Sequence, residues 1–216
     1  MQIIGICGRK GSGKSTLAGQ IGGMRLPFAH FLKEGLIAMG VPEEAIYDPI
    51  KKEEPLDILQ GKSGRYAMQT LGTEWGRGMM GPEFWTDLWL HAVMRLHSET
   101  CIVVDDVRFP QEVQMIRDLG GMVFAVVRGQ IPEHSNNKWV RMWQQRNIHP
   151  SERLVYEDYD IPIILNNSTP ENLFAEYNHE MTSENLAQRY GRDITTPRGS
   201  PPNQKTGLFD DGHTGA

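Results

Sequence analysis

The chain has 216 residues, of which 39% are hydrophobic and 23% are charged, a composition that suits one α/β domain with its own core. A formal net charge of −5 argues against a general nucleic-acid-binding protein. No apolar run approaches the roughly 18 residues of a membrane span, and the two cysteines suit reduced core positions, so we expect a cytoplasmic protein with neither a nucleic acid polymer nor a membrane as partner.

The first predicted elements are a buried strand over about 2–7 and a helix that begins directly after residues 8–15. Residues 8–15 (Gly-Arg-Lys-Gly-Ser-Gly-Lys-Ser) fit G-x-x-x-x-G-K-[ST], the phosphate-binding P-loop. A loop between a strand and a helix directs backbone N–H groups and the positive helix end at one anion. Lys14 reaches the β- and γ-phosphates, and Ser15 offers its hydroxyl to Mg²⁺. The expected ATP-binding residues are Gly8, Lys10, Gly11, Ser12, Gly13, Lys14, Ser15 and Thr16.

The next segments show strand-like, helical and loop-like patterns in turn. A short strand is expected over Met24–Phe28, and apolar residues at helical spacing follow over 31–39. Residues 41–62 are rich in Pro, Lys and Glu, which predicts a loop or mobile segment. Two helices are then expected, over about 65–77 and 83–97.

The predicted helix over 65–77 has an unusual face. At 100° per residue, one stripe carries Arg65, Gln69, Gly72 and Gly76. The apolar stripe that should face the core consists of Ala67, Met68, Leu71 and Trp75. Glycine inside a helix costs about 1 kcal/mol relative to alanine. The glycine face therefore either packs closely against another element or leaves room for a ligand, with a phosphate on Arg65 and a base near Gln69.

A second motif follows the apolar run Cys101–Val104, which predicts a buried strand that ends in Asp105 and Asp106. In P-loop proteins a carboxylate at this place, a Walker B aspartate, holds Mg²⁺, and here either aspartate could serve. Arg108 comes two residues later, where a guanidinium can make bidentate hydrogen bonds to a phosphate. A surface ion pair is the alternative role for Arg108.

The remaining elements are predicted as helices over 110–119 and 169–179 and strands over 122–127 and 161–165. This alternation predicts the α/β class: a P-loop NTPase three-layer sandwich, in which a parallel sheet has helices on both faces. Ligands of such sheets bind at the carboxyl ends of the strands.

The rest of the expected domain organisation is a lid and a tail. The P-loop domain should cover 1–180, and the polar composition of 181–216 predicts a flexible, disordered tail. The long basic connection over 129–153 suggests a lid, whose Arg141 and Arg146 could close over a transferring phosphoryl group. A solvated helix with Trp139 and Trp143 packed on the body is the alternative, and both can hold together. Asn166 follows the last strand, where an adenine could rest.

These runs resemble the phage-type deoxynucleoside monophosphate kinases, a branch of the P-loop nucleoside monophosphate kinases. The resemblance covers about 1–178, and its most specific parts are the runs Gln69–Arg77 and Asp106–Pro110. It also rests on Gly8–Ser15, Phe28-Ala29, Leu32-Lys33-Glu34, Arg65, Phe84-Trp85, Glu112, Gly120-Gly121, His149, Ser151-Glu152 and Asn166-Asn167. It implies transfer of the ATP γ-phosphate to a deoxynucleoside monophosphate, with ATP and Mg²⁺ as cofactors, in the host bacterial cytoplasm if the chain is phage-encoded.

The resemblance also implies a role for each candidate residue. Binding of the acceptor nucleotide is expected from Lys33, Arg65, Gln69, Arg108 and Glu152. Catalysis is expected from Lys14, Arg108, Arg141 and Arg146, binding of Mg²⁺ from Ser15 with Asp105 or Asp106, and contact with ATP from Asn166. Because the acceptor phosphate is already anionic, positioning and charge neutralisation suffice without a strong base. The alternatives are a kinase of another small metabolite and a nucleotide-hydrolysing switch or ATPase module, and a homodimer is left open.

Overall fold

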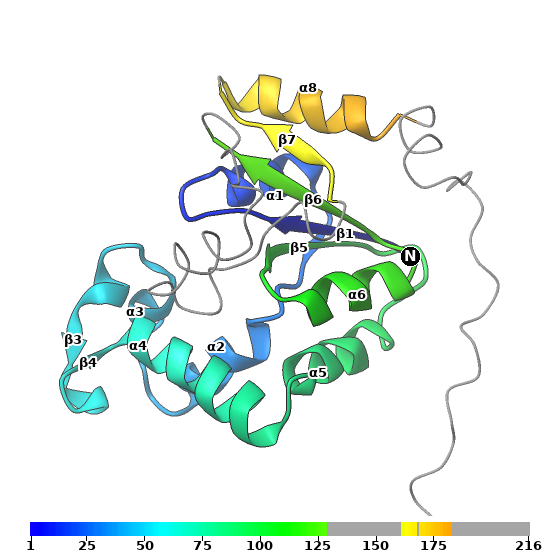
Figure 1. Cartoon of the computed structure of the whole chain (residues 1–216). Helices are drawn as coiled ribbons and strands as arrows, with labels where there is room; N and C mark the ends of the chain where they lie inside the picture. The colour runs from blue at the N-terminus through cyan, green and yellow to red at the C-terminus, as the bar shows by residue number, and fades with distance from the viewer. Residues whose placement is uncertain (129–160, 168, 183–216) are drawn as a thin grey trace, which may run out of the picture.

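Five parallel strands form the central sheet in the computed structural model of the chain, which describes residues 1–128, 161–167 and 169–182 (Figure 1). The strand order is β2-β5-β1-β6-β7. The strands are β1 (Gln2–Cys7), β2 (Met24–Arg25), β5 (Cys101–Val107), β6 (Met122–Val127) and β7 (Ile163–Leu165). Their carboxyl ends point to one edge of the sheet, where the P-loop lies, so the sheet positions the loop and the end of β5 next to each other.

Helices cover both faces of this sheet, as the alternating pattern predicts. Successive residues of a strand point to opposite faces, so Ile3 and Cys7 pack against one helical layer while Ile4 and Ile6 pack against the other. The first layer consists of α5 (Phe84–Val93) and α6 (Pro110–Asp118), and the second of α1 (Lys14–Ile21) and α8 (Pro170–Glu180). The predicted three-layer α/β architecture is therefore confirmed.

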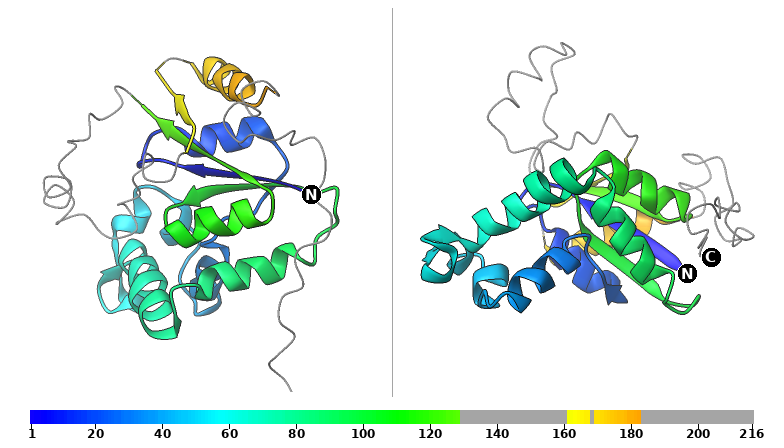
Figure 2. Two further views of the ribbon diagram at one scale, coloured as in Figure 1. Left: turned by 45° about the vertical axis from the view of Figure 1, so that its right-hand side comes forward. Right: turned by 90° about the horizontal axis from the view of Figure 1, so that it is seen from below.

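Residues 30–80 form a helical arm that extends from the sheet on the side of the P-loop (Figures 1 and 2). The arm has a small core of its own: Leu36, Val41, Ala45 and Ile46. Its main helices are α2 (His30–Ala38), α4 (Gly64–Gln69) and η3 (Thr70–Met80). Between them lie α3 (Glu44–Tyr47), the single turns η1 (Lys51–Glu53) and η2 (Asp57–Leu59), and the antiparallel strands β3 (Pro55–Leu56) and β4 (Lys62–Ser63).

The loop predicted over 41–62 is therefore wrong in its larger part. The elements found there are two to four residues long, which is too short for a helical or strand period to emerge from the sequence. They form because Ala45 and Ile46 are buried in the arm core, so tertiary packing stabilises elements that local propensity alone would not.

The regular helix predicted over 65–77 is also wrong beyond Gln69. From Thr70 the chain winds as a π-helix, with bonds from residue i+5 to residue i, such as Gly81 N to Gly76 O at 3.0 Å. A Cβ atom at Gly76 would lie 2.1 Å from Nε1 of Trp85, so only glycine leaves room for this indole. The close-packing alternative for the glycine face thus holds at Gly76. Because the winding changes, Trp75 is 39% exposed and does not join the core as expected.

Most other boundaries shift by a few residues from their predicted places, which is common at element ends. The predicted helix over 83–97 ends at Val93, and the strand predicted over Met24–Phe28 ends at Arg25. Both cysteines are free thiols, as expected. Within the described ranges no helix has the length and apolar composition needed to cross a bilayer. The predicted lid, over 129–153, and most of the predicted tail lie outside the described residues.

Candidate active site

The P-loop has the backbone geometry of an anion cradle. Gly8, Gly11 and Gly13 have φ angles of 145°, 79° and 106°, a region that side-chain-bearing residues rarely adopt. The helix α1 begins at Lys14, with neither a side-chain cap at Gly13 nor an acidic residue in its first turn. In the part of the chain that the structure describes, the buried Ser12 hydroxyl has no hydrogen-bond partner. A polyphosphate fits these residues, because it accepts from N–H and O–H donors and suits the positive helix end.

The Lys14 side chain lies along this loop. Its Nζ donates to the backbone oxygens of Gly8 at 2.7 Å and Arg9 at 2.8 Å. These bonds hold the ammonium group over the loop, where the phosphates of a nucleotide would be bound. The Lys14 ammonium group therefore lies against the P-loop backbone, and its contact with phosphates stays a prediction.

The two adjacent aspartates at the end of β5 have separate partners. Ser15 Oγ donates to Asp105 Oδ2 at 3.1 Å, which places the Asp105 carboxylate beside the P-loop. The carboxylate of Asp106 instead accepts from the backbone N–H groups of Phe28 and Ala29, both at 2.9 Å. Burial raises the pKa of Asp106. Of the two candidates, Asp105 lies with the P-loop serine, and Asp106 holds the chain that leads into the arm.

An irregularity in the sheet lies at the two aspartates. Gly5 of β1 pairs with Val104, but Cys7 pairs with Val107, so β5 carries one extra residue at this point. Such a bulge re-aims the side chains next to it.

Arg25, which the sequence did not mark as a candidate, also reaches Asp105. The Arg25 guanidinium forms an ion pair with Asp105 Oδ2, the same oxygen that accepts from Ser15. Arg25 is the last residue of β2 and pairs with Val103 of β5. The predicted strand ran on to Phe28, so the sequence held no signal that Arg25 ends the strand.

The donor set at Asp105 and Ser15 fits Mg²⁺, which prefers oxygen ligands and keeps several waters. Among the described residues, no group of three or more His, Cys, Asp and Glu side chains could hold a metal ion. A magnesium ion here would therefore take its remaining ligands from phosphate oxygens and water, as in other sites built on one or two protein oxygens.

The helical arm contributes a group of cations next to the P-loop. Arg65 Nε donates to Glu53 Oε1 at 2.5 Å, and Lys10 Nζ of the P-loop lies 3.5 Å from the same oxygen. This ion pair lowers the pKa of Glu53, mainly through the hydrogen bond from Arg65. Lys52 precedes Glu53 in the chain, and burial, followed by the charges of Arg65 and Lys10, lowers the pKa of its ammonium group. The phosphate-binding loop and Arg65 therefore lie on the same side of the molecule.

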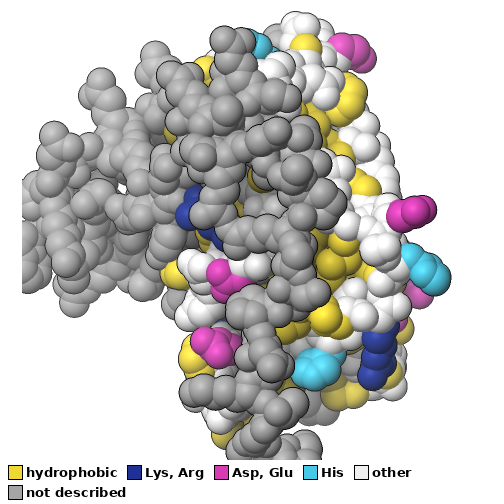
Figure 3. Space-filling model, turned by 90° about the vertical axis from the view of Figure 1, so that its right-hand side faces the viewer, with side chains coloured by type: hydrophobic (Ala, Val, Ile, Leu, Met, Phe, Trp, Pro, Cys, Tyr) yellow, Lys and Arg dark blue, Asp and Glu magenta, His cyan; other side chains and the backbone are white. Residues whose placement is uncertain are grey.

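Figure 3 shows the opposite edge, where the strands begin. Lys10 of the P-loop and Arg65 of the arm lie at the other end of the strands, at the ligand edge, which is where the fold predicts an anionic ligand.

The other predicted acceptor residues line the arm and the end of β5. Lys33 Nζ, on α2, lies 4.9 Å from the ring centroid of Tyr47. Gln69 is half-buried at the end of α4. Arg108 follows β5, and its backbone N–H donates to Glu112 Oε2 at 2.6 Å. Arg141, Arg146 and Glu152 lie outside the described residues, so their roles stay predictions.

Asn166 supports the P-loop through a hydrogen bond to its backbone. Its side chain is buried, and Nδ2 donates to the backbone oxygen of Ser12 at 2.7 Å. A Cβ atom at Gly13 would lie 2.3 Å from this amide, so the asparagine and the loop touch closely. The bond to Ser12 indicates that Asn166 acts through the shape of the loop, in addition to any contact with a base.

We expect Asn166→Ala to raise the KM for ATP by about 5- to 10-fold, because one buried hydrogen bond contributes about 1 kcal/mol and its loss frees the loop. Asn167→Ala is the matched control, since Asn167 is exposed. Steady-state kinetics with ATP varied at saturating acceptor measures both. If the two variants had the same KM for ATP, Asn166 would not brace the donor site.

Two comparisons with known proteins show similarity to one family. The family model for deoxynucleotide monophosphate kinase matches residues 42–176 of the chain. A protein of Acanthamoeba polyphaga mimivirus, which carries the provisional name deoxynucleotide monophosphate kinase, is 29% identical over 194 residues, covering 82% of this chain and 94% of that protein. The range matched by the family model contains Glu53, Arg65, Asp105 and Arg108.

Proposed function

Because this chain belongs to the deoxynucleotide monophosphate kinase family, we propose that its P-loop binds ATP and its helical arm binds the deoxynucleoside monophosphate. The protein is an ATP-dependent phosphotransferase that phosphorylates a nucleotide monophosphate. The observation that best supports this division is the Glu53 carboxylate, which lies between Lys10 of the P-loop and Arg65 of the arm. An anion bound there would contact both halves of the site.

On the donor side, the backbone N–H groups of the P-loop and the Lys14 ammonium group hold the β- and γ-phosphates of ATP. Ser15 and Asp105 are the proposed magnesium ligands, because their oxygens already lie 3.1 Å apart. When bound, Mg²⁺ neutralises charge on the phosphate oxygens. Arg25 shares Asp105 Oδ2, so its guanidinium is the group that a metal ion displaces or adjoins.

On the acceptor side, Arg65 and Arg108 are proposed to bind the phosphate of the monophosphate, with Lys33 and Gln69 toward its sugar and base. Guanidinium groups suit this task because they make bidentate bonds to phosphate. The nucleophile is a phosphate oxygen that already carries negative charge. The residues therefore need to hold it in line with the ATP γ-phosphate, and no general base is required.

In the transition state, Lys14 and Arg108 are proposed to neutralise the charge on the transferring group, which is where electrostatic catalysis is strongest. Arg141 and Arg146 remain predicted contributors. The family match does not favour the alternatives of a kinase for an unrelated metabolite or a hydrolysing switch.

The direct test is ADP release from ATP in the presence of each common deoxy- and ribonucleoside monophosphate. We expect ADP release to depend on the acceptor and to be fastest with one or more deoxynucleoside monophosphates, with the diphosphate as product. ADP release at the same rate without any acceptor would instead indicate a nucleotide hydrolase.

A second experiment separates the roles of the two aspartates. We expect Asp105→Asn to raise the Mg²⁺ concentration for half-maximal activity by about 10-fold or more, since a neutral amide oxygen is a much weaker ligand than a carboxylate. Asp106→Asn should leave that concentration unchanged and lower the temperature of thermal unfolding, because one of its two backbone bonds is lost. The reverse pattern would exchange the two assignments.

A further inference from the structure

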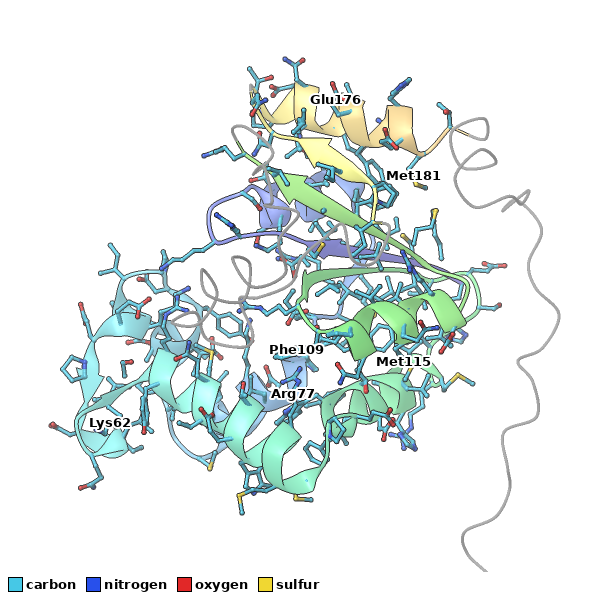
Figure 4. The ribbon with its side chains drawn as sticks, in the orientation of Figure 1. Lys62, Arg77, Phe109, Met115, Glu176 and Met181 are labelled. Carbon is cyan, nitrogen blue, oxygen red and sulfur yellow. The ribbon has the colours of Figure 1, made fainter. Side chains whose placement is uncertain are left out.

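A buried ion pair joins the helical arm to the body of the protein, away from the proposed donor site. Arg77 extends from η3 and places its guanidinium 2.6 Å from Glu112 Oε1 on α6. The same guanidinium donates to the backbone oxygen of Gly72 at 2.9 Å and lies 3.8 Å from the ring centroid of Phe109. Figure 4 shows Arg77 and Phe109 next to each other between the arm and α6.

The second carboxylate oxygen of Glu112 also accepts hydrogen bonds. Glu112 Oε2 accepts from the backbone N–H groups of Arg108 at 2.6 Å and Phe109 at 3.0 Å. One carboxylate therefore binds the arm through one oxygen and the Arg108 backbone through the other. Glu112 is only 2% exposed, so water cannot replace either partner.

This arrangement has a geometric consequence for the two arginines proposed to bind the acceptor. Arg65 lies on α4, which continues directly into η3 and Arg77. Arg108 lies on the loop after β5. The ion pair between Arg77 and Glu112 thus connects the element that carries Arg65 with the loop that carries Arg108.

We propose that Glu112 and Arg77 are positioning residues, which hold Arg108 and Arg65 at the spacing that the phosphate of the acceptor nucleotide requires. This inference rests on the proposed function, in which Arg108 binds that phosphate. Neither residue needs to touch the nucleotide. A phosphate held by two guanidinium groups is sensitive to their spacing, because the bonds weaken steeply when distance or angle changes.

The charge of Glu112 provides an independent readout. Burial raises the pKa of Glu112 to about 7, while Arg77 opposes the rise and Asp106 adds to it. The charged groups that face it are Arg77 from η3, Asp106 from β5 and Arg108 from the loop. Below this pKa the carboxyl is neutral and binds Arg77 more weakly, so acceptor binding should tighten as pH rises through about 7.

The experiment uses Glu112→Gln in the full chain, with Asp118→Asn as the matched control, since Asp118 ends the same helix. We expect Glu112→Gln to raise the KM for the deoxynucleoside monophosphate by about 10-fold and to change the KM for ATP by less than about twofold. In the wild type and in Asp118→Asn, the KM for the acceptor should fall as the pH rises through about 7. In Glu112→Gln this fall should be absent. An equal rise in both KM values, or an unchanged pH profile, would overturn the inference.

A double variant distinguishes this inference from the function on which it rests. If Glu112 acts by positioning Arg108, Glu112→Gln adds little to the acceptor KM once Arg108→Ala is present. If the two substitutions instead multiplied each other's effect on the acceptor KM, the positioning role of Glu112 would be contradicted, while the proposed function would stand. If Arg108→Ala by itself left the acceptor KM unchanged, the proposed role of Arg108 would fail, and the inference with it. Should Glu112→Gln not fold, Arg77→Lys keeps the charge, loses the second guanidinium bond and is expected to show the same selective rise in acceptor KM.

Discussion

Replacement of Lys14 by alanine is expected to lower kcat by about 10²- to 10³-fold, the loss seen when one charged or hydrogen-bonding group is removed from a developing negative charge. The fold should persist, because the Lys14 ammonium group donates to the backbone oxygens of Gly8 and Arg9 at the surface loop and the side chain is not part of the apolar core. The expected cause is the loss of a cation that stabilises the charge of the transition state more than that of the bound ground state.

The measurement is ADP release at saturating ATP and acceptor, together with thermal unfolding of the same sample. Lys62→Ala is the matched control, since Lys62 lies on β4 at the far end of the arm (Figure 4). It should retain wild-type kcat. A Lys14→Ala enzyme with near-normal turnover would remove the P-loop from the donor site.

Replacement of Arg65 by alanine is expected to raise the KM for the deoxynucleoside monophosphate by about 10- to 100-fold, since charge-assisted bonds to phosphate are among the strongest that a side chain makes. The KM for ATP should change little. Arg65 lies on the arm and reaches toward the P-loop only through the carboxylate of Glu53.

Glu53→Gln is the control that makes this result interpretable. It removes the charge that pairs with Arg65 and Lys10 but keeps Arg65 available for a phosphate. If the ion pair itself supported the site, both variants would lose acceptor affinity. We expect only Arg65→Ala to lose it. Equal changes in the KM for ATP and for the acceptor would place Arg65 outside the acceptor site.

The sheet and the donor site could be predicted from the sequence because their signals are local. The strand over 2–7, the P-loop and the start of α1 are consecutive in the chain. The glycines of the loop mark the positions where the backbone needs a positive φ angle. The apolar run before Asp105 predicted the strand and the acidic end of β5 in the same way. The carboxyl-end rule then predicted which residues should lie together.

The arm was harder to predict, because its structure depends on contacts between distant residues. The helical period assigned to 65–77 assumed uniform winding, but the Trp85 indole, from the next helix, occupies the space beside Gly76 and donates to the Gly72 carbonyl at 2.8 Å. The change to π-helical winding accompanies this contact, and Arg77 turns inward to Glu112. A single sequence holds no signal for the meeting of these side chains.

The same reason explains why the ion pairs escaped prediction. Arg25 with Asp105, Arg65 with Glu53 and Arg77 with Glu112 join residues that are far apart in the chain or separated by an irregular turn. The sequence marked Arg65, Asp105 and Arg108 as candidates, but not their partners. Residue type and spacing can indicate which groups bind an anion, whereas the fold decides what holds those groups before the anion arrives.

Alternation along β5 gives two adjacent aspartates different partners on opposite faces of the sheet. Asp105 shares the face of Val103, toward α1, and Asp106 shares the face of Val104, toward α5; the bulge then restores Val107 to the α5 side. Deletion of a single residue from Cys101–Val104 would invert this parity. The Asp105 carboxylate would then point away from the P-loop, and the Asp106 carboxylate would lose its bonds to the amides of Phe28 and Ala29. We therefore expect the loss of one codon in this apolar run to lower activity as much as the replacement of both aspartates.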